Sequence, residues 1–338
     1  MRKIKLSVLD QTPIRKGSNA SESLQESIQL AKLTDRLGYT RYWLSEHHNS
    51  KTLASGSPEI MIARLGAETE RIRLGSGGMM MPNHSTFRVA ENFKVLEGLY
   101  PNRIDLGMGR APGTDRLTAH LLNPSNQFAP KDYIQQLRDL QQLLNDEPLE
   151  GISEVKVSAI PIVNTNPDLW ILTSSGESAL IAAHFGMALS FAQFINPVGC
   201  ANAIANYKKQ FKPSAELNEP QTSVGIFAFC SDDEEKVKRA QALMDYRLLS
   251  FERGKFDQIY GYDDIKDELY DAQEQQRILF NRQRMAVGTP AQMKQQIEKL
   301  CDDFDTDEII ISTFTENAED RFRSYELLAE VFDLQNHA

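Results

Sequence analysis

An alternation of short apolar runs with longer segments of helical period constrains the fold of this chain more than any other feature. Eight β-branched or apolar runs are each followed by a helical pattern, as in βα units around a parallel sheet. Although 338 residues leave one or two domains open, eight units predict a single α/β domain over residues 1–338, a (β/α)8 (TIM) barrel. The expected strands are Ile4–Leu9, Arg41–Leu44, Arg71–Ser76, Arg103–Gly107, Leu169–Thr173, Ala188–Ala192, Ser223–Phe229 and Glu308–Thr313.

Helix start signals support this alternation, and two stretches interrupt it. Ser21, Ser57 and Thr289 are expected to begin helices, the last two with a proline in the next position. Asn145–Pro167 is an insertion with scattered Pro, Gly and Asn before the fifth strand, and Ser231–Arg284 is a long charged stretch after the seventh. In a barrel the second stretch lies where a lid would lie. Whether it gates a substrate or forms a pair of solvated helices stays open at this point.

Composition narrows the class of partner. A formal net charge of −10 works against non-specific nucleic-acid binding, and no apolar run approaches the ~18–20 residues of a membrane span. No apolar signal region precedes the first strand. The three cysteines are odd in number and widely spaced, which indicates neither a disulfide framework nor a cysteine metal site. We therefore expect a cytoplasmic protein that acts on a small molecule, with no nucleic acid and no membrane as partner.

The second expected strand ends in three titratable residues, Glu46, His47 and His48, within YWLSEHHNS (residues 42–50). Barrel chemistry lies at the carboxyl ends of strands. Alternation predicts that Glu46 and His48 point one way and His47 the other. A shared metal ion is disfavoured, because adjacent strand residues cannot easily bind one ion and no His-x-x-x-His spacing is present. A histidine that transfers protons and a pair that merely orients or packs both remain candidates.

Glycine-rich stretches end the third and fourth expected strands. Without Cβ atoms, their backbone can closely approach a flat ring or a phosphate. The second stretch does not meet the dinucleotide fingerprint, because its glycines follow G-x-G-x-x-x-G and Pro112 interrupts them. The stretches are LGSGGMMMP (residues 74–82), which contains Ser76, Gly77 and Gly78, and LGMGRAPG (residues 106–113), which contains Gly109 and Arg110.

Polar groups also gather where the helix after the fifth strand begins. The stretch LTSSGESAL (residues 172–180) places Ser174, Ser175 and Ser178 around Gly176. Backbone N–H groups, hydroxyls and the positive end of the helix dipole converge there. Alone, this would be an ordinary Ser-Gly helix cap. Together with the fixed cation Arg110, it predicts a phosphate site, which we call the phosphate cradle.

Four stretches, in this order, resemble the luciferase-like flavin monooxygenase family. Members of that family are (β/α)8 barrels that use reduced flavin mononucleotide (FMN). The resemblance covers most of the chain apart from the insertion and the stretch after the seventh strand. The matching stretches are LGYTRYWLSEHHN (37–49), residues 71–113, residues 170–192 and VGTPAQMKQQIEKL (287–300).

The resemblance implies roles for individual residues. His47 would lie beside the flavin and assist proton transfer, and Arg110 would bind the flavin phosphate with Ser175 and Ser178. The Gly77-Gly78 peptide stands where the family often has a non-prolyl cis peptide against the ring. Bacterial luciferase has a reactive cysteine at the position of Gly109, which argues against light emission here. The other expected cofactor-binding residues are Ser76, Gly77, Gly78, Gly109, Ser174 and Gly176.

The implied activity is that of a flavoprotein oxidoreductase of the monooxygenase type. Reduced FMN and O2 would oxygenate a small organic substrate in a pocket that excludes water. Met79, Met80 and Met81 could line this pocket or belong to the core. A deazaflavin-dependent dehydrogenase on the same barrel and a non-catalytic flavin-binding protein remain as alternatives.

Two partners follow from the same reasoning. No dinucleotide fingerprint follows any expected strand, and one cluster of phosphate donors suits a mononucleotide, so we expect a separate flavin reductase to supply reduced FMN. Family members commonly form homodimers, and the segments Pro58–Glu68 and Thr86–Leu99 carry small and apolar residues that could pair. A homodimer is therefore expected.

Overall fold

The computed structural model describes residues 3–125, 129–149, 157–255 and 257–337. Within these residues nine strands alternate with helices and lie in one sheet. The strands are β1 (Lys5–Asp10), β2 (Arg41–Leu44), β3 (Arg73–Met80), β4 (Ile104–Gly109), β5 (Asp168–Thr173), β6 (Ala188–Ala192), β7 (Thr222–Cys230), β8 (Met285–Gly288) and β9 (Glu308–Ser312).

Eight of these strands close into a barrel. The first strand, β1, pairs with β2 on one side and with β9 on the other, and the β6–β7 pairing completes the ring. All neighbouring strands are parallel, and helices connect them. The expected (β/α)8 barrel is therefore confirmed.

The ninth strand, β8, is absent from the sequence-based assignment. Met285–Gly288 pairs with Phe227–Cys230, the carboxyl-terminal half of β7. The expected end of the third strand is also wrong, because β3 continues to Met80. Its pairing with β4 runs on through Gly77, although glycine is disfavoured in strands.

Helices cover the outside of the barrel. The first of them begins earlier than expected, because Asn19 rather than Ser21 is its N-cap and accepts a hydrogen bond from the backbone N–H of Glu22 (3.1 Å). Thr289 caps its helix as expected. The helices are α1 (Ala20–Leu37), α2 (Pro58–Gly66), α3 (Thr86–Leu99), α4 (Arg116–Leu122), α5 (Pro130–Leu144), α6 (Gly176–Phe185), α7 (Cys200–Gln210), α8 (Glu234–Glu252), α9 (Tyr262–Ile265), α10 (Ala272–Asn281), α11 (Pro290–Phe304) and α12 (Ala318–Val331), with 3-10 turns η1 (Met81–Asn83), η2 (Arg282–Arg284) and η3 (Leu334–His337).

The two interrupting stretches differ in structure. Residues 150–156 of the expected insertion lie outside the described residues, and its described parts contain no strand and no helix. The charged stretch after β7 forms α8, α9, α10 and η2. Across the part of the chain that the structure describes, no helix is both long enough and apolar enough to span a membrane.

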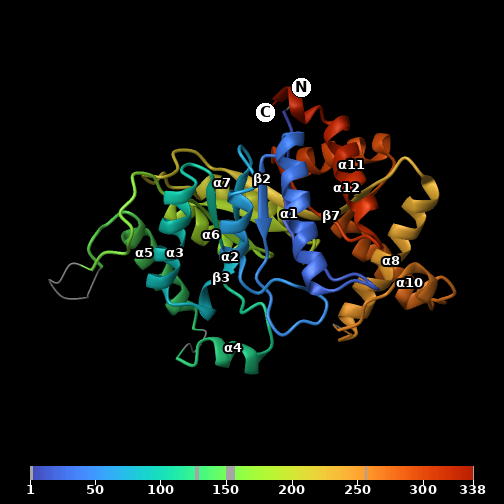
Figure 1. Ribbon diagram of the computed structural model, residues 1–338, viewed down its shortest axis with the longest axis horizontal. Helices are drawn as coiled ribbons and strands as arrows, with labels where there is room; N and C mark the ends of the chain where they lie inside the picture. Colours follow the sequence, from blue (N-terminus) through green and yellow to red (C-terminus); the bar gives the residue numbers. More distant parts are fainter. Residues whose placement is uncertain (1–2, 126–128, 150–156, 256, 338) are drawn as a thin grey trace.

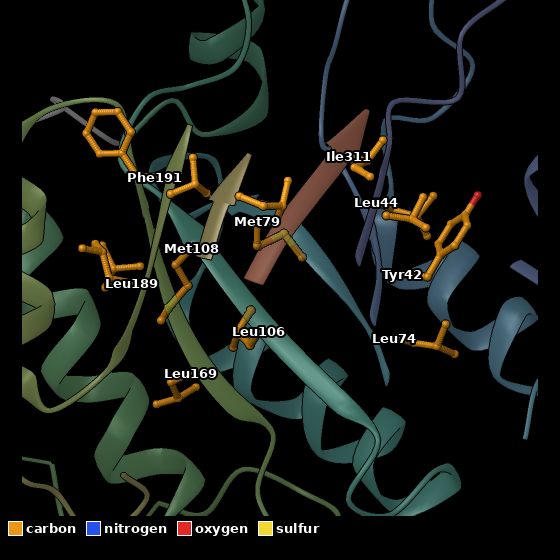
Figure 2. Packing of buried hydrophobic residues seen from close by; sticks show 14 of the residues in the cluster. Tyr42, Leu44, Leu74, Met79, Leu106, Met108, Leu169, Leu189, Phe191 and Ile311 are labelled. Carbon is orange, nitrogen blue, oxygen red and sulfur yellow. The ribbon is translucent and has the colours of Figure 1, made fainter. Parts of the chain in front are cut away.

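The main hydrophobic core lies between the barrel and its helices. Alternate residues of each strand point outward into it, as the period of two requires. Figure 2 shows Leu74, Leu106 and Leu169 from three neighbouring strands among these side chains. The remaining alternate residues therefore face the barrel interior.

Buried ion pairs fill the interior at the amino ends of the strands. Arg41 pairs with Asp105 of β4 (Nη1–Oδ2, 2.7 Å) and with Glu308 of β9 (Nε–Oε1, 2.6 Å). Burial alone would lower the pKa of Arg41, but these two carboxylates raise it. The guanidinium also lies over the ring of Trp170, 4.5 Å from its centroid. These contacts link four strands, β2, β4, β5 and β9, at the amino end of the barrel.

The carboxyl ends of the strands gather at the opposite end of the barrel, which we call the mouth. In Figure 1 the arrow of β2 points toward the end of the molecule where α4 lies. Helix α8 lies beside the mouth, because its residues Met244 and Leu248 pack against Phe227 of β7. The expected catalytic and phosphate-binding residues all follow strands at this end.

Candidate active site

Glu46 is buried directly after β2, and its carboxylate collects donors from two loops. It accepts hydrogen bonds from the backbone N–H of Met80 (2.8 Å) and from Nδ2 of Asn83 (3.1 Å). Its Oε1 also lies 2.9 Å from Nε2 of His84 and 2.8 Å from Nε2 of His48. Glu46 therefore fastens the loop after β2 to the residues at the end of β3 and beyond it.

The charge state of this cluster follows from its hydrogen bonds. Burial alone would raise the pKa of Glu46, but hydrogen bonds from His48 and His84 lower it to about 2. Glu46 in turn raises the pKa of His84, against the effect of burial. The contact between Glu46 and His48 confirms that these two residues share one side of the chain. An ionised carboxylate in this position orients its neighbours and does not itself exchange protons near neutral pH.

His47 interacts instead with the backbone of Gly113, in the loop after β4. Burial lowers the pKa of His47, and the Gly113 backbone and the Glu46 carboxylate offset this only in part. A neutral imidazole near pH 7 is able to accept a proton. The surroundings of His47 therefore suit the proton-transfer role expected from the sequence.

Two consecutive glycines, Gly77 and Gly78, leave the backbone near the end of β3 without side chains. The Gly77-Gly78 peptide is cis. A Cβ on Gly77 would lie 2.7 Å from Cδ1 of Leu9, and one on Gly78 would lie 2.7 Å from the carbonyl oxygen of Gly107. Ser76 donates its hydroxyl to the same Gly107 carbonyl (2.8 Å), so its side chain is already engaged within the sheet. Packing thus excludes any larger residue at these two glycines.

The three methionines after these glycines have different surroundings. Met79 and Met81 are 1% and 0% exposed and belong to the main core. Met80 is half-buried, and a Cβ on Gly109 would lie 2.8 Å from its sulfur. Only Met80 is therefore placed to border the mouth.

The first turn of α6 also lies at the mouth. Ser175 is its N-cap, but the Ser175 side chain makes no capping hydrogen bond. Gly176 faces open space, since no atom lies within 4 Å of a Cβ built there. Ser178 is buried one turn into the helix, and the carbonyl of Ser174 accepts a hydrogen bond from the Asn196 side chain (2.9 Å). This turn presents unpaired backbone N–H groups and a hydroxyl, which suits an anion.

Arg110 and Tyr133 join this turn from other elements. Arg110 pairs with Glu177 in the first turn of α6 (Nη1–Oε2, 2.8 Å). Tyr133 of α5 is 3% exposed, and its hydroxyl has no hydrogen-bond partner among the described residues. Burial raises the pKa of Tyr133, and the charge of Arg110 opposes this, so the Tyr133 hydroxyl lies within the electrostatic range of the guanidinium. Sequence reasoning missed Tyr133, because no local motif marks it.

These residues fit a phosphate group. A buried hydroxyl without a partner costs ~1–3 kcal/mol, and an anion beside Arg110 would accept its hydrogen bond. The carboxylate of Glu177 lies on the same guanidinium and would have to give way. The residues that would hold the phosphate of a mononucleotide are Arg110, Tyr133, Ser175 and Ser178.

Three phenylalanines line the mouth on the side of β6, β7 and β9, and we call them the aromatic wall. They are Phe194 after β6, Phe227 on β7 and Phe314 after β9, with neighbouring ring centroids 5.4 and 5.6 Å apart. Phe194 lies over Gly225, where a Cβ would be 2.8 Å from its ring. The wall gives a small apolar molecule a surface across the mouth from the glycines of β3 and β4. The described residues contain no group of three or more His, Cys, Asp or Glu placed to hold a metal ion.

Comparison with known proteins gives matches along nearly the full chain. A family model described as luciferase-like monooxygenase matches residues 4–306. The uncharacterized protein YwcH of Bacillus subtilis (strain 168) is 44% identical, over 97% of this chain and 99% of the relative. A protein of Escherichia coli (strain K12) named luciferase-like monooxygenase is 33% identical, over 97% of each chain. The N-acetyl-S-alkylcysteine monooxygenase of Bacillus subtilis (strain 168) is 32% identical, over 97% of this chain and 98% of the relative.

Solved structures share the same barrel. The crystal structure of apo-MsnO8 has a TM-score of 0.86 and 32% identity, and the match covers 98% of this chain and 99% of the other. The oxygenating constituent of 3,6-diketocamphane monooxygenase from Pseudomonas putida, solved in complex with FMN, has a TM-score of 0.71 and 16% identity over 97% of each chain. An F420-dependent secondary alcohol dehydrogenase has a TM-score of 0.66 and 13% identity, over 98% of this chain and 99% of the other. The last two likenesses concern the fold alone.

Proposed function

The chain belongs to the luciferase-like monooxygenase family, and from this premise we propose that it is the oxygenating component of a two-component system. In this proposal it uses reduced FMN and O2 to oxygenate a small organic substrate. As a member of this family, the chain is a flavin-dependent monooxygenase or oxidoreductase.

The phosphate cradle is the observation that carries the choice of FMN. It combines a cation, Arg110, with a buried hydroxyl that has no partner among the described residues, that of Tyr133. Arg110 reaches the first turn of α6 through Glu177, and Ser175 at that turn leaves its own hydroxyl free of a capping bond. One compact anion satisfies all of these groups, which supports a terminal phosphate rather than an extended pyrophosphate.

The neighbouring residues have separate tasks in this proposal. Bound reduced FMN would supply the two-electron reduction of O2 that oxygen insertion requires. His47, which burial keeps neutral, would take or return a proton beside the ring. Glu46 would hold the loops in place through His48 and the backbone of Met80. The aromatic wall would exclude water from the reacting side.

Names of relatives favour oxygenation over hydride transfer. Two relatives at 33% and 32% identity are named monooxygenases, whereas the F420-dependent dehydrogenase that shares the barrel is 13% identical. A deazaflavin cofactor therefore stands as the competing outcome of the test below.

Two partners belong to the same proposal. A separate flavin reductase would supply reduced FMN, since no dinucleotide fingerprint follows any strand. A second copy of the chain would pack on α2 and α3. These helices expose Ile60, Val95 and Leu99, which are 67%, 46% and 57% accessible.

Oxygen uptake tests the proposal. The purified chain is supplied with NADH and oxidised FMN, first alone and then with a flavin reductase. We expect little NADH oxidation by the chain alone, and uptake of O2 into an organic substrate only in the complete mixture. Rapid NADH oxidation without the reductase would contradict the two-component scheme. Tight binding of F420 with no binding of FMN would replace the monooxygenase assignment with the deazaflavin alternative.

A further inference from the structure

Arg247 of α8 is a cation without a counter-ion beside the aromatic wall. Its Cζ lies over the ring of Phe314, 3.7 Å from the centroid. It makes no hydrogen bond and no ion pair with any residue in the part of the chain that the structure describes. The other arginines between α8 and η2 each pair with a carboxylate, and they are Arg239, Arg253, Arg277, Arg282 and Arg284.

Protein surrounds the Arg247 side chain, although solvent reaches it. The residue is exposed, yet desolvation lowers its pKa to about 10, and no charged neighbour contributes. The guanidinium is therefore accessible to a solute while it stays in contact with the ring of Phe314. Arginine remains protonated at neutral pH under these conditions. A partly desolvated charge without a partner is unfavourable, and the contact with Phe314 offsets only a part of this.

The position of α8 brings Arg247 to the mouth of the barrel. Met244, one turn before Arg247 on the same face of the helix, belongs to one buried apolar cluster with Phe227. Phe227 in turn contacts Phe314, with ring centroids 5.6 Å apart. The guanidinium therefore lies at the edge of the aromatic wall. In the strand order, β7 and β9, which carry Phe227 and precede Phe314, are not neighbours of β3 or β4.

A cavity near Arg247 is less suited to an anion. It has a volume of about 380 Å³, lies along the preceding turns of α8 and is also lined by Phe314. Its lining carries more acidic than basic residues. Its two cations are engaged, Arg239 with Glu316 and Lys236 with Asp320. Arg247, by contrast, has no carboxylate beside it among the residues that the structure describes.

We propose that Arg247 binds the carboxylate of the substrate, while the apolar part of the substrate lies along the aromatic wall toward the glycines of β3. The planar guanidinium matches the two oxygens of a carboxylate, and the rings match a short hydrocarbon or thioether chain. The proposal rests on the proposed function and names its substrate class, small organic carboxylates with an apolar chain.

Three probes with the same chain test the head group: hexanoate, hexanamide and hexylammonium. Each is titrated into the full-length protein, with and without FMN, and binding is followed by ligand-observed NMR. We expect hexanoate to bind the wild type on the order of 10-fold more tightly than hexanamide, with hexylammonium the weakest. Arg247→Met keeps the length of the side chain and its contact with Phe314 but removes the charge. It should weaken hexanoate on the order of 10- to 100-fold and leave hexanamide unchanged.

Two further variants make the test specific. Arg239→Met removes a paired arginine from the same helix and should leave the affinity for hexanoate unchanged. Arg247→Lys should restore part of the preference for the anion. Equal binding of hexanoate and hexanamide to the wild type would overturn the proposal, as would an equal loss of both in Arg247→Met. If the protein prefers the anion but does not bind FMN, the proposed function is rejected and this inference stands. If the protein oxygenates substrates without any head-group preference, this inference is rejected and the proposed function stands.

Discussion

Replacing Glu46 with glutamine tests whether its carboxylate holds the mouth together. The side chain is 0% exposed, and its oxygens accept from Met80, Asn83, His84 and His48. Glutamine keeps one acceptor oxygen but replaces the other with an NH2 group. This donor would face the N–H groups that the carboxylate oxygen accepts in the wild type. The mutation therefore imitates the protonated acid, and the pKa of the group predicts its cost.

The pKa of Glu46 falls from 4.5 to about 2 on folding. At about 1.4 kcal/mol for each tenfold change in acidity, the folded protein favours the ionised form by about 3 kcal/mol. Removing one partner from a buried charged pair typically costs ~3–5 kcal/mol, which agrees with this value. Because the folded pKa is lowered, the stabilisation is complete above pH 4.5 and is lost as the pH falls toward 2.

The assay is urea unfolding of wild type and Glu46→Gln at pH 5.5 and pH 3. We expect a difference in the free energy of unfolding of about 3 kcal/mol at pH 5.5 and about 1.4 kcal/mol at pH 3. Glu68→Gln is the control, because Glu68 also has two basic partners but lies where water screens them, so this change should matter little. A loss for Glu46→Gln below about 0.5 kcal/mol, or one that is equal at both pH values, would refute the reasoning.

The remaining predictions concern the cofactor and the proton. His47→Gln should lower turnover by about 10²- to 10⁴-fold while FMN affinity stays within a few-fold. It should also flatten the acidic limb of the pH profile of turnover, because the pKa of His47 is lowered and its protonation below neutral pH inhibits the wild type. An unchanged pH profile would remove His47 from the mechanism. Arg110→Ala should weaken FMN far more than riboflavin in equilibrium titrations, since only FMN has a phosphate; equal weakening would give Arg110 a structural role. Tyr133→Phe should weaken FMN on the order of 10- to 100-fold and leave riboflavin unchanged, as expected for one hydrogen bond to a charged group.

Much of the fold is predictable from the sequence because its signals are local. Each of the eight barrel strands is a short apolar run beside a helical pattern, and the barrel follows from their number and order. The four-residue strand β8 carries no such signal, since so short a run also occurs in helices. It forms because β7 extends past its pairing with β6 and offers an edge.

The residues of the candidate site likewise fall into those that the sequence predicts and those that it does not. His47, Arg110 and the serines of α6 stand at strand ends, where the barrel itself predicts chemistry. Tyr133 and Arg247 come from helices, and their significance lies in what they lack, a hydrogen-bond partner and a counter-ion among the described residues. An absent partner leaves no trace in local sequence. Such residues become visible only when distant segments are placed side by side.

The arrangement of the mouth bears on how such a protein changes over time. The residues proposed to hold the cofactor come from the ends of β2 to β5, from α5 and from the start of α6, whereas the aromatic wall and Arg247 come from β6 to β9 and α8. Substitutions that alter one of these chain segments need not disturb the other. A lineage of this architecture can therefore acquire new substrates through its later segments while it inherits the handling of its cofactor unchanged, and an engineer can exchange α8 and its flanking loops on the same grounds.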